Sequence, residues 1–265
     1  MNELTVLGTG NAQSVNFYNT CFYLKTAEGG LLVDAGGGNG ILGRLRDTGI
    51  DILSIRHMFL THAHCDHILG AVWVTRIIGQ KIREYEGSFT VYGHREVLDA
   101  LRRICEITVP QSVIRLFDER IIFRELQSGE RVNLIGSDFT FFDIGSSKMK
   151  QFAFTAVLPG GGRLSFLGDE PLSAAGERYI EGSNWLLTEA FCLYAEREKF
   201  RPYEKHHTTV KEAAECAEER NIPNLVLLHT EDSHDGDRSE LYETEARRYY
   251  SGRVIVPADG CRIRL

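Results

Sequence analysis

Four side chains that can bind a transition metal fall within six positions, namely His62, His64, Asp66 and His67. They follow the apolar residues 58–60 and precede the apolar residues 68–78. A strand, a tight loop and a helix in this order would direct several ligands to one point. Neutral imidazoles with a carboxylate suit zinc, manganese or iron better than calcium or magnesium. A loop that is merely rich in histidine is the alternative, but this spacing rarely arises by chance, so it predicts a metal site.

The pattern His-x-His-x-Asp-His resembles the signature of the metallo-β-lactamase fold superfamily. The resemblance implies that His62 and His64 bind one metal ion, and that Asp66 and His67 bind a second one. It implies one or two divalent ions as cofactors, with zinc first and manganese or iron as alternatives. Asp34 resembles the first motif of the superfamily, a carboxylate near the site, which would orient a ligating imidazole. A turn-stabilising Asp without any part in the site is the alternative.

The same resemblance supplies two ligands from later strands. Asp169 follows Gly168 after an apolar strand and matches the carboxylate that bridges the two metals in the superfamily. His229 follows the apolar residues 224–228 and matches the last ligand, which completes the shell of the second metal.

One expected ligand is missing. The superfamily places a third His for the first metal after the strand that corresponds to residues 139–143, and here Gly145 stands at that position. Open positions can remain on a catalytic zinc with three protein ligands. A single ion at Asp66, His67, Asp169 and His229 is one alternative, and replacement of the missing ligand by Asp143, Cys65 or water is another.

Two segments resemble the ribonuclease Z branch of the superfamily. The sequence Thr188-Glu189-Ala190-Phe191 partly matches its His-Glu-Ala-Thr motif. His207, before an Ala-rich helix, matches a histidine thought to give a proton to the leaving group. For His207 the alternative is an idle neighbour of a helix cap. The resemblance implies catalytic roles for Asp66, His207 and Glu189, the last holding or tuning a site imidazole.

Many short strands with helices on both sides predict two stacked sheets inside helical outer layers. No linker, repeat or low-complexity tract divides the chain. We therefore expect residues 1–265 to form one α/β domain, a four-layer αββα sandwich, and the resemblance places its metal site at the edge between the sheets. Trp73, in the apolar segment after the histidines, is expected in the core, and His94 at a helix cap or on the surface.

Composition limits the partners and the compartment. Lys and Arg total 30 and Asp and Glu total 37, so the formal charge is −7 and opposes polyanions. No apolar run approaches the roughly 20 residues that cross a bilayer. The chain start lacks a secretory signal pattern, and six scattered Cys indicate reduced, mostly buried thiols. The sequence therefore predicts a cytoplasmic protein that does not bind a membrane.

Ribonuclease Z grips tRNA with a long inserted arm, whereas residues 146–168 leave room here for two strands and a turn. A small or short phosphodiester is therefore the expected substrate and tRNA is not. By analogy with relatives, a homodimer is expected. Three residues after Gly145 are predicted to contact a phosphate: Ser146, Ser147 and Lys148.

These observations together predict a metal-dependent hydrolase, a ribonuclease Z-like phosphodiesterase that attacks through a metal-bound hydroxide. One alternative is a lactone or thioester hydrolase that uses the same centre. The other is a non-catalytic metal-binding or sensor protein, because Gly145 leaves the first metal site incomplete.

Overall fold

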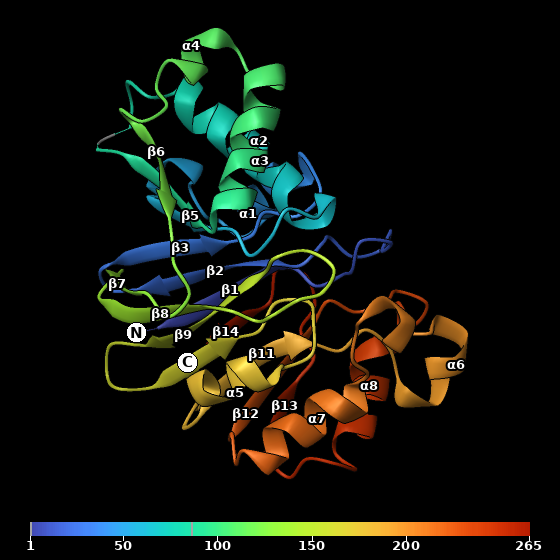
Figure 1. Ribbon diagram of the computed structural model, residues 1–265. Coiled ribbons are helices and arrows are strands. Elements are labelled where there is room, and N and C mark those ends of the chain that lie inside the picture. Colours follow the sequence, from blue (N-terminus) through green and yellow to red (C-terminus); the bar gives the residue numbers. More distant parts are fainter. Residues whose placement is uncertain (1, 86) are drawn as a thin grey trace.

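The computed structural model describes residues 2–85 and 87–265, so Met1, at the start of the predicted domain, lies outside the described residues. Over these residues the chain forms two seven-stranded sheets. The sheets pack face to face, and helices cover both outer faces (Figure 1). This arrangement confirms the predicted four-layer α/β sandwich.

The first sheet comes from the N-terminal half together with the last strand of the chain. Its order is β14 (Arg262–Arg264), β1 (Glu3–Gly8), β2 (Cys21–Thr26), β3 (Gly29–Val33), β4 (His57–Phe59), β5 (Phe89–Gly93) and β6 (Ile121–Glu125). Strands β3 to β6 are parallel, and the others pair antiparallel. Its outer helices are α1 (Gly40–Asp47), α2 (Cys65–Gln80), α3 (Arg95–Thr108) and α4 (Gln111–Ile114), at the top of Figure 1.

The second sheet comes from the C-terminal half. Its order is β13 (Arg253–Ile255), β12 (Asn224–Leu228), β11 (Trp185–Glu189), β10 (Arg163–Phe166), β9 (Phe152–Val157), β8 (Ser137–Asp143) and β7 (Arg131–Leu134). Strands β10 to β13 are parallel. The helices α5 (Ala174–Ile180), α7 (Val210–Glu219) and α8 (Arg238–Ala246) lie below it in Figure 1. Short turns complete the chain: α6 (Arg197–Phe200), η1 (Ile52–Ser54), η2 (Tyr194–Glu196) and η3 (Tyr203–Lys205).

Phenylalanine side chains fill the space between the sheets. Phe59 of the first sheet contacts Phe141 of the second with ring centroids 4.7 Å apart, and Phe22 meets Phe166 edge to face at 4.9 Å. All four side chains are buried. Because alternate residues of a strand point to opposite faces, Phe139 and Phe141 both enter this core from β8. Buried aromatic pairs of this kind stabilise the packing of the two sheets against each other.

The strand directions bring the candidate site residues to one edge of the sandwich. Parallel strands have their carboxyl ends on the same side, and ligand sites of open α/β sheets lie there. Asp34 follows β3 and the histidine loop follows β4, while Asp169 follows β10 and His229 follows β12; Glu189 is the last residue of β11. Residues far apart in sequence therefore meet where the two sheets adjoin.

Two local expectations need correction or refinement. Trp73 is 38% exposed and not in the core. Helix α2 contacts α1 and α3, and its residues Ile68, Ala71, Val74 and Ile78 join the buried cluster of the first sheet, so Trp73 lies on the opposite, outer face of the helix. His94 is buried and caps α3, with its Nδ1 accepting a hydrogen bond from the Val97 amide. Within the described residues, no helix combines the length and apolarity needed to cross a lipid bilayer.

Candidate metal centre

The histidine motif divides between a loop and a helix. His62 and His64 lie in the loop after β4, whereas Asp66 and His67 belong to the first turn of α2, which begins at Cys65. The helix packs directly on the loop after β3, because a Cβ on Gly70 would lie 1.8 Å from the carbonyl oxygen of Ala35. Only glycine permits this approach, which brings His67 next to the end of β3.

Asp34 anchors both halves of the motif. Its Oδ2 accepts hydrogen bonds from His67 Nδ1 and from the Thr61 hydroxyl, each at 2.8 Å, and its Oδ1 accepts from the Thr61 amide at 2.9 Å. The Thr61 hydroxyl oxygen in turn accepts from His62 Nδ1 at 2.9 Å. These bonds leave Nε2 of His62 and of His67 free for other partners. The geometry fits the predicted orienting role of Asp34, which stays a prediction.

Two carboxylates face the Nε2 atoms of His62, His67 and His229. Oδ2 of Asp66 lies 3.4 Å from His67 Nε2 and 3.5 Å from His229 Nε2. Oδ2 of Asp169 lies 3.6 Å from His62 Nε2, 3.8 Å from His229 Nε2 and 3.9 Å from His67 Nε2. One oxygen of Asp169 is thus near all three imidazoles. His64 adjoins the group, with its Nδ1 2.8 Å from His62 Nε2. The structure therefore brings together all six residues that the sequence nominates as ligands.

These distances fit a divalent ion. Ligand atoms about 2.1 Å from a tetrahedral zinc stand about 3.4 Å from each other, close to the 3.4 to 3.9 Å between the carboxylate oxygens and the imidazole nitrogens. Nε2 of His67 is buried and has no hydrogen-bond partner among the described residues, as expected of an atom placed for a metal. Two triplets of donor atoms around the carboxylates of Asp66 and Asp169 are compact enough to hold an ion: His62, His67 and Asp169, and Asp66, His67 and His229. A third such triplet, of Glu189, His207 and His229, adjoins them.

The charges of the centre also favour a cation. Burial opposes ionisation of Asp66, yet His67 and His229 hold the pKa of its carboxyl well below the usual range. For Asp169, burial is likewise outweighed by His62, His229, His67 and His207, and its pKa is lowered. Burial alone would lower the pKa of His229, but hydrogen bonding to Asp66 and Glu189 and the charge of Asp169 raise it to about 9. The ionised carboxylates of Asp66 and Asp169 thus stabilise positive charge on the groups that face them.

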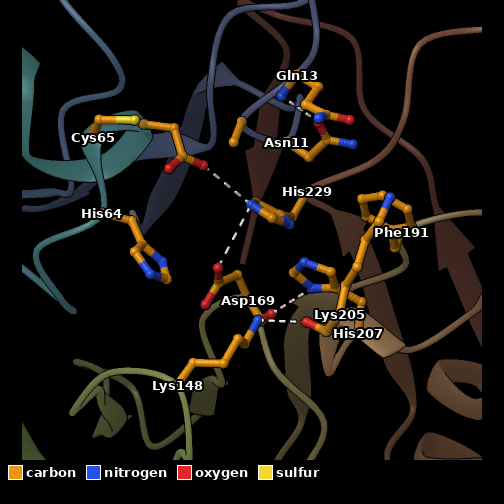
Figure 2. Close-up of a pocket in the computed structure, with 12 residues that line it drawn as sticks. Asn11, Gln13, His64, Cys65, Lys148, Asp169, Phe191, Lys205, His207 and His229 are labelled. Atoms are coloured by element: carbon orange, nitrogen blue, oxygen red, sulfur yellow. Dashed lines mark hydrogen bonds and ion pairs between the residues drawn. The ribbon is translucent and has the colours of Figure 1, made fainter. Parts of the chain in front are cut away.

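A cavity of about 440 Å³ opens beside the carboxylates (Figure 2). In Figure 2, His64 and Cys65 lie on one side, and Phe191, Lys205 and His207 lie on the other. The residues that line it are Asn11, Ala12, Gln13, His64, Cys65, Asp66, Lys148, Asp169, Phe191, Lys205, His207 and His229. A bound molecule would therefore touch the predicted ligands and His207 together.

Buried Glu189 fixes the orientation of His207. Nδ1 of His207 donates to Glu189 Oε2 at 2.7 Å and lies 2.9 Å from the Asp169 carbonyl oxygen. Glu189 Oε1 accepts from the Thr208 amide at 2.8 Å, and the ring of His207 stacks on Phe191 with centroids 4.7 Å apart. Glu189 Oε2 is also 3.7 Å from His229 Nδ1. Nε2 of His207 is left for a molecule in the cavity.

The loop around Gly145 brings only one of the three residues predicted to contact a phosphate to the cavity wall, namely Lys148. The Ser146 hydroxyl donates to Glu170, and the Ser147 hydroxyl is 3.4 Å from His206 Nδ1, so both serine side chains make loop contacts instead. Asp143 accepts a hydrogen bond from the Gly145 amide, while Cys65, the other nominated substitute, lies at the cavity wall.

Sequence reasoning missed several residues of the centre. Gln151 is buried and donates to Asp169 Oδ1 at 2.7 Å, and no motif marks it. Asn11, Gln13 and Lys205 line the cavity. A signal existed for Asn11 and Gln13, since polar residues after a Gly-x-Gly turn at the end of the first strand lie at the same sheet edge. Lys205 directly precedes His206 and His207.

Comparisons with known proteins identify the fold and the family of this chain. A ribonuclease Z from Myxococcus xanthus (strain DK1622) is 26% identical over 310 residues, covering 99% of this chain and 97% of that protein. The metallo-β-lactamase fold protein YhfI from Bacillus subtilis superposes with a TM-score of 0.78 at 18% identity, covering 99% of this chain and 98% of that one. A diphosphatase from the PhnP family gives 0.76 at 16% identity, with coverages of 100% and 98%.

These likenesses confirm the metallo-β-lactamase fold and a ribonuclease Z-like sequence. The model of one family, described as anti-Pycsar protein Apyc1, matches residues 2–169. The match includes the histidine motif and Asp169 and ends before Glu189, His207 and His229. Because it spans more than half of the sequence, the chain belongs to the anti-Pycsar Apyc1 family of metallo-β-lactamase fold proteins.

Proposed function

We propose that this chain is a metal-dependent phosphodiesterase that acts on a small or compact phosphodiester. One observation carries the proposal: His207, oriented by Glu189, faces the same cavity as the carboxylates and imidazoles of Asp66, Asp169 and His229. A site with ligands for a divalent ion beside a histidine positioned to give up a proton suits cleavage of an ester with a poor leaving group. The hydrolase class is supported by the relatives and by the donor set.

The proposed cofactor is one or two divalent ions, with zinc first. His62, His64 and Asp169 would hold one, and Asp66, His67, Asp169 and His229 the other. A bound divalent ion acidifies a coordinated water and neutralises charge that develops on phosphoryl oxygens. The donor set of imidazoles and carboxylates is the chemical reason for this choice.

The remaining steps belong to the protein's own side chains. Asp66, whose Oδ2 lies 3.4 Å from His67 Nε2 and 3.5 Å from His229 Nε2, would double as a ligand and as the base that orients the attacking water. His207 would donate the Nε2 proton to the departing oxygen, while Glu189 holds Nδ1 and keeps the ring in place. Lys148, at the cavity wall, offers the positive charge that a phosphate requires.

The size and charge of the site favour a compact substrate. The cavity measures about 440 Å³, within the range of small-molecule sites. The formal charge of −7 opposes association with a long polyanion. We therefore propose a small or short phosphodiester in preference to tRNA, although ribonuclease Z is the name that several relatives carry.

A panel of substrates tests the proposal. Protein purified without chelator is assayed for bound metal and for hydrolysis of a phosphodiester, a lactone and a thioester with the same chromophore. We expect metal in the protein and turnover of the phosphodiester above all. Faster turnover of the lactone or of the thioester would show that the protein hydrolyses that class of ester and not phosphodiesters. Absence of both metal and turnover would favour a sensor with an incomplete centre.

A further inference from the structure

The loop between β8 and β9 ends in a buried amide. This loop includes Gly145, which is exposed, has φ +73 and stands where the superfamily has its third His. Its last residue, Gln151, is 1% exposed. Burying a polar amide costs free energy unless it is hydrogen-bonded. The position of Gln151 in the core of the site therefore calls for a specific partner.

That partner is the carboxylate shared by the centre. Nε2 of Gln151 donates to Oδ1 of Asp169 at 2.7 Å, in a buried environment. An ionised carboxylate can only accept hydrogen bonds, so the NH₂ group and not the carbonyl of the amide must face it. With Oδ1 occupied, Oδ2 is the oxygen that faces the imidazoles of His62, His67 and His229 at 3.6 to 3.9 Å.

The backbone around Gln151 keeps this contact in place. The Ile144 amide donates to the Gln151 carbonyl at 3.1 Å, and the next amide, of Phe152, donates to the Thr61 carbonyl beside the histidine loop at 3.0 Å. Gly168, which precedes Asp169, has φ +81, and a Cβ there would lie 2.2 Å from Gln151 Nε2. A side chain at position 168 would therefore displace the amide, and glycine leaves room for it.

We infer that Gln151 is a positioning residue of the metal centre, which turns Asp169 so that a single oxygen serves both halves of the site. The inference depends on the proposed metal-dependent function. The half formed by His62 and His64 lacks a third imidazole, so its affinity depends more than usual on a fixed third donor. Loss of a hydrogen bond that orients a metal ligand typically lowers the affinity for the metal 10- to 100-fold.

The test replaces Gln151 by Leu, which keeps the approximate size and removes the donor. The matched control is Gln127→Leu, because Gln127 also donates to a carboxylate, Glu125 Oε1 at 2.9 Å, but on the exposed surface. Each protein, purified with its metal, is titrated with a chelator, and retained zinc is counted by elemental analysis. We expect Gln151→Leu to lose one ion per chain at a 10- to 100-fold lower chelator concentration, and the control to match the unmodified protein.

Two further measurements separate positioning from folding. Thermal unfolding in excess chelator reports on the protein without metal, and a structural role alone would lower that melting temperature without changing retention of zinc. Gln151→Glu, which has the same shape but places a carboxylate against Asp169, is expected to retain zinc as poorly as the Leu variant. If the Leu variant does not fold, the Glu variant takes its place in the chelator titration.

The outcomes are distinguishable. If the Gln151 variants retain zinc as well as the unmodified chain, the inference is overturned and the proposed hydrolase stands. If the unmodified chain neither carries nor takes up a divalent ion, both are overturned. Selective loss of zinc from the Gln151 variants supports both.

Discussion

Replacing His207 by Ala should slow cleavage of only those phosphodiesters whose leaving group needs a proton. In the structure, Nδ1 of His207 is occupied by Glu189 Oε2 at 2.7 Å, and the ring stacks on Phe191, so Nε2 is the atom available to a substrate. An alkoxide leaving group is strongly basic and requires that proton. A nitrophenolate is stable as an anion and does not.

The magnitude follows from proton donation by a positioned side chain. General acid catalysis contributes about 10²- to 10⁴-fold, and each factor of ten corresponds to about 1.36 kcal/mol of activation free energy. The barrier for an alkyl leaving group should therefore rise by about 2.7 to 5.4 kcal/mol in His207→Ala. For a nitrophenyl leaving group the change should remain within a factor of about ten, because proton donation contributes little to that reaction.

The assay compares kcat for the two substrates in the unmodified chain, in His207→Ala and in His206→Ala. His206 is the exposed neighbour and provides the matched control. Bound metal is counted in each sample and should be unchanged, since the Nε2 atoms that face the carboxylates belong to other histidines. Equal slowing of both substrates by His207→Ala would refute proton donation and leave His207 a role in shaping the cavity.

Further predictions concern the metal centre and the loop beside it. Asp34→Asn, which tolerates the φ of +52, should reduce zinc retention about 10- to 100-fold in a chelator titration, because the charge that orients His67 is lost. Chelation should lower the melting temperature and added zinc should restore it, since a ligand that binds only the folded state stabilises it; an unchanged melting temperature would contradict the site. Gly145→Ala should lower stability by about 1–2 kcal/mol, seen as a fall of a few °C in melting temperature, because its φ of +73 disfavours a Cβ. Its zinc content should stay the same.

The histidine motif illustrates what the sequence can reveal. Its four candidate ligands are close in the chain, and a strand end followed by a helix start fixes their relative directions locally. Asp169 and His229 were nominated because their places after apolar strands match the later ligands of the family that the motif resembles. The two-sheet architecture was predictable for a related reason, since it depends on the alternation and length of apolar segments.

Residues placed by long-range packing were not predictable in this way. Gln151 acts through Asp169, 18 positions later, and this contact depends on how β9 pairs with β10. Lys205 reaches the cavity from η3, a turn without periodicity. Trp73 was misplaced because an apolar run carries no information on which face of its helix another element will cover. Helix α8 and strands β13 and β14 were likewise missed, because the strands are three residues long and the helix is rich in charged residues.

The buried charges of the centre give the metal proposal a basis that does not depend on the motif. Asp34, Asp66, Asp169 and Glu189 are each at most 5% exposed, and buried carboxylates are costly unless positive charge and hydrogen bonds surround them. Lys148 cannot serve them all, because its ammonium donates to the Lys205 carbonyl at 2.7 Å and lies 3.6 Å from Glu170. Protons on the imidazoles, or a cation that replaces them, would supply positive charge directly beside the carboxylates. Since the imidazole nitrogens and carboxylate oxygens already stand about as far apart as the ligands of one ion, a divalent cation satisfies them with little rearrangement.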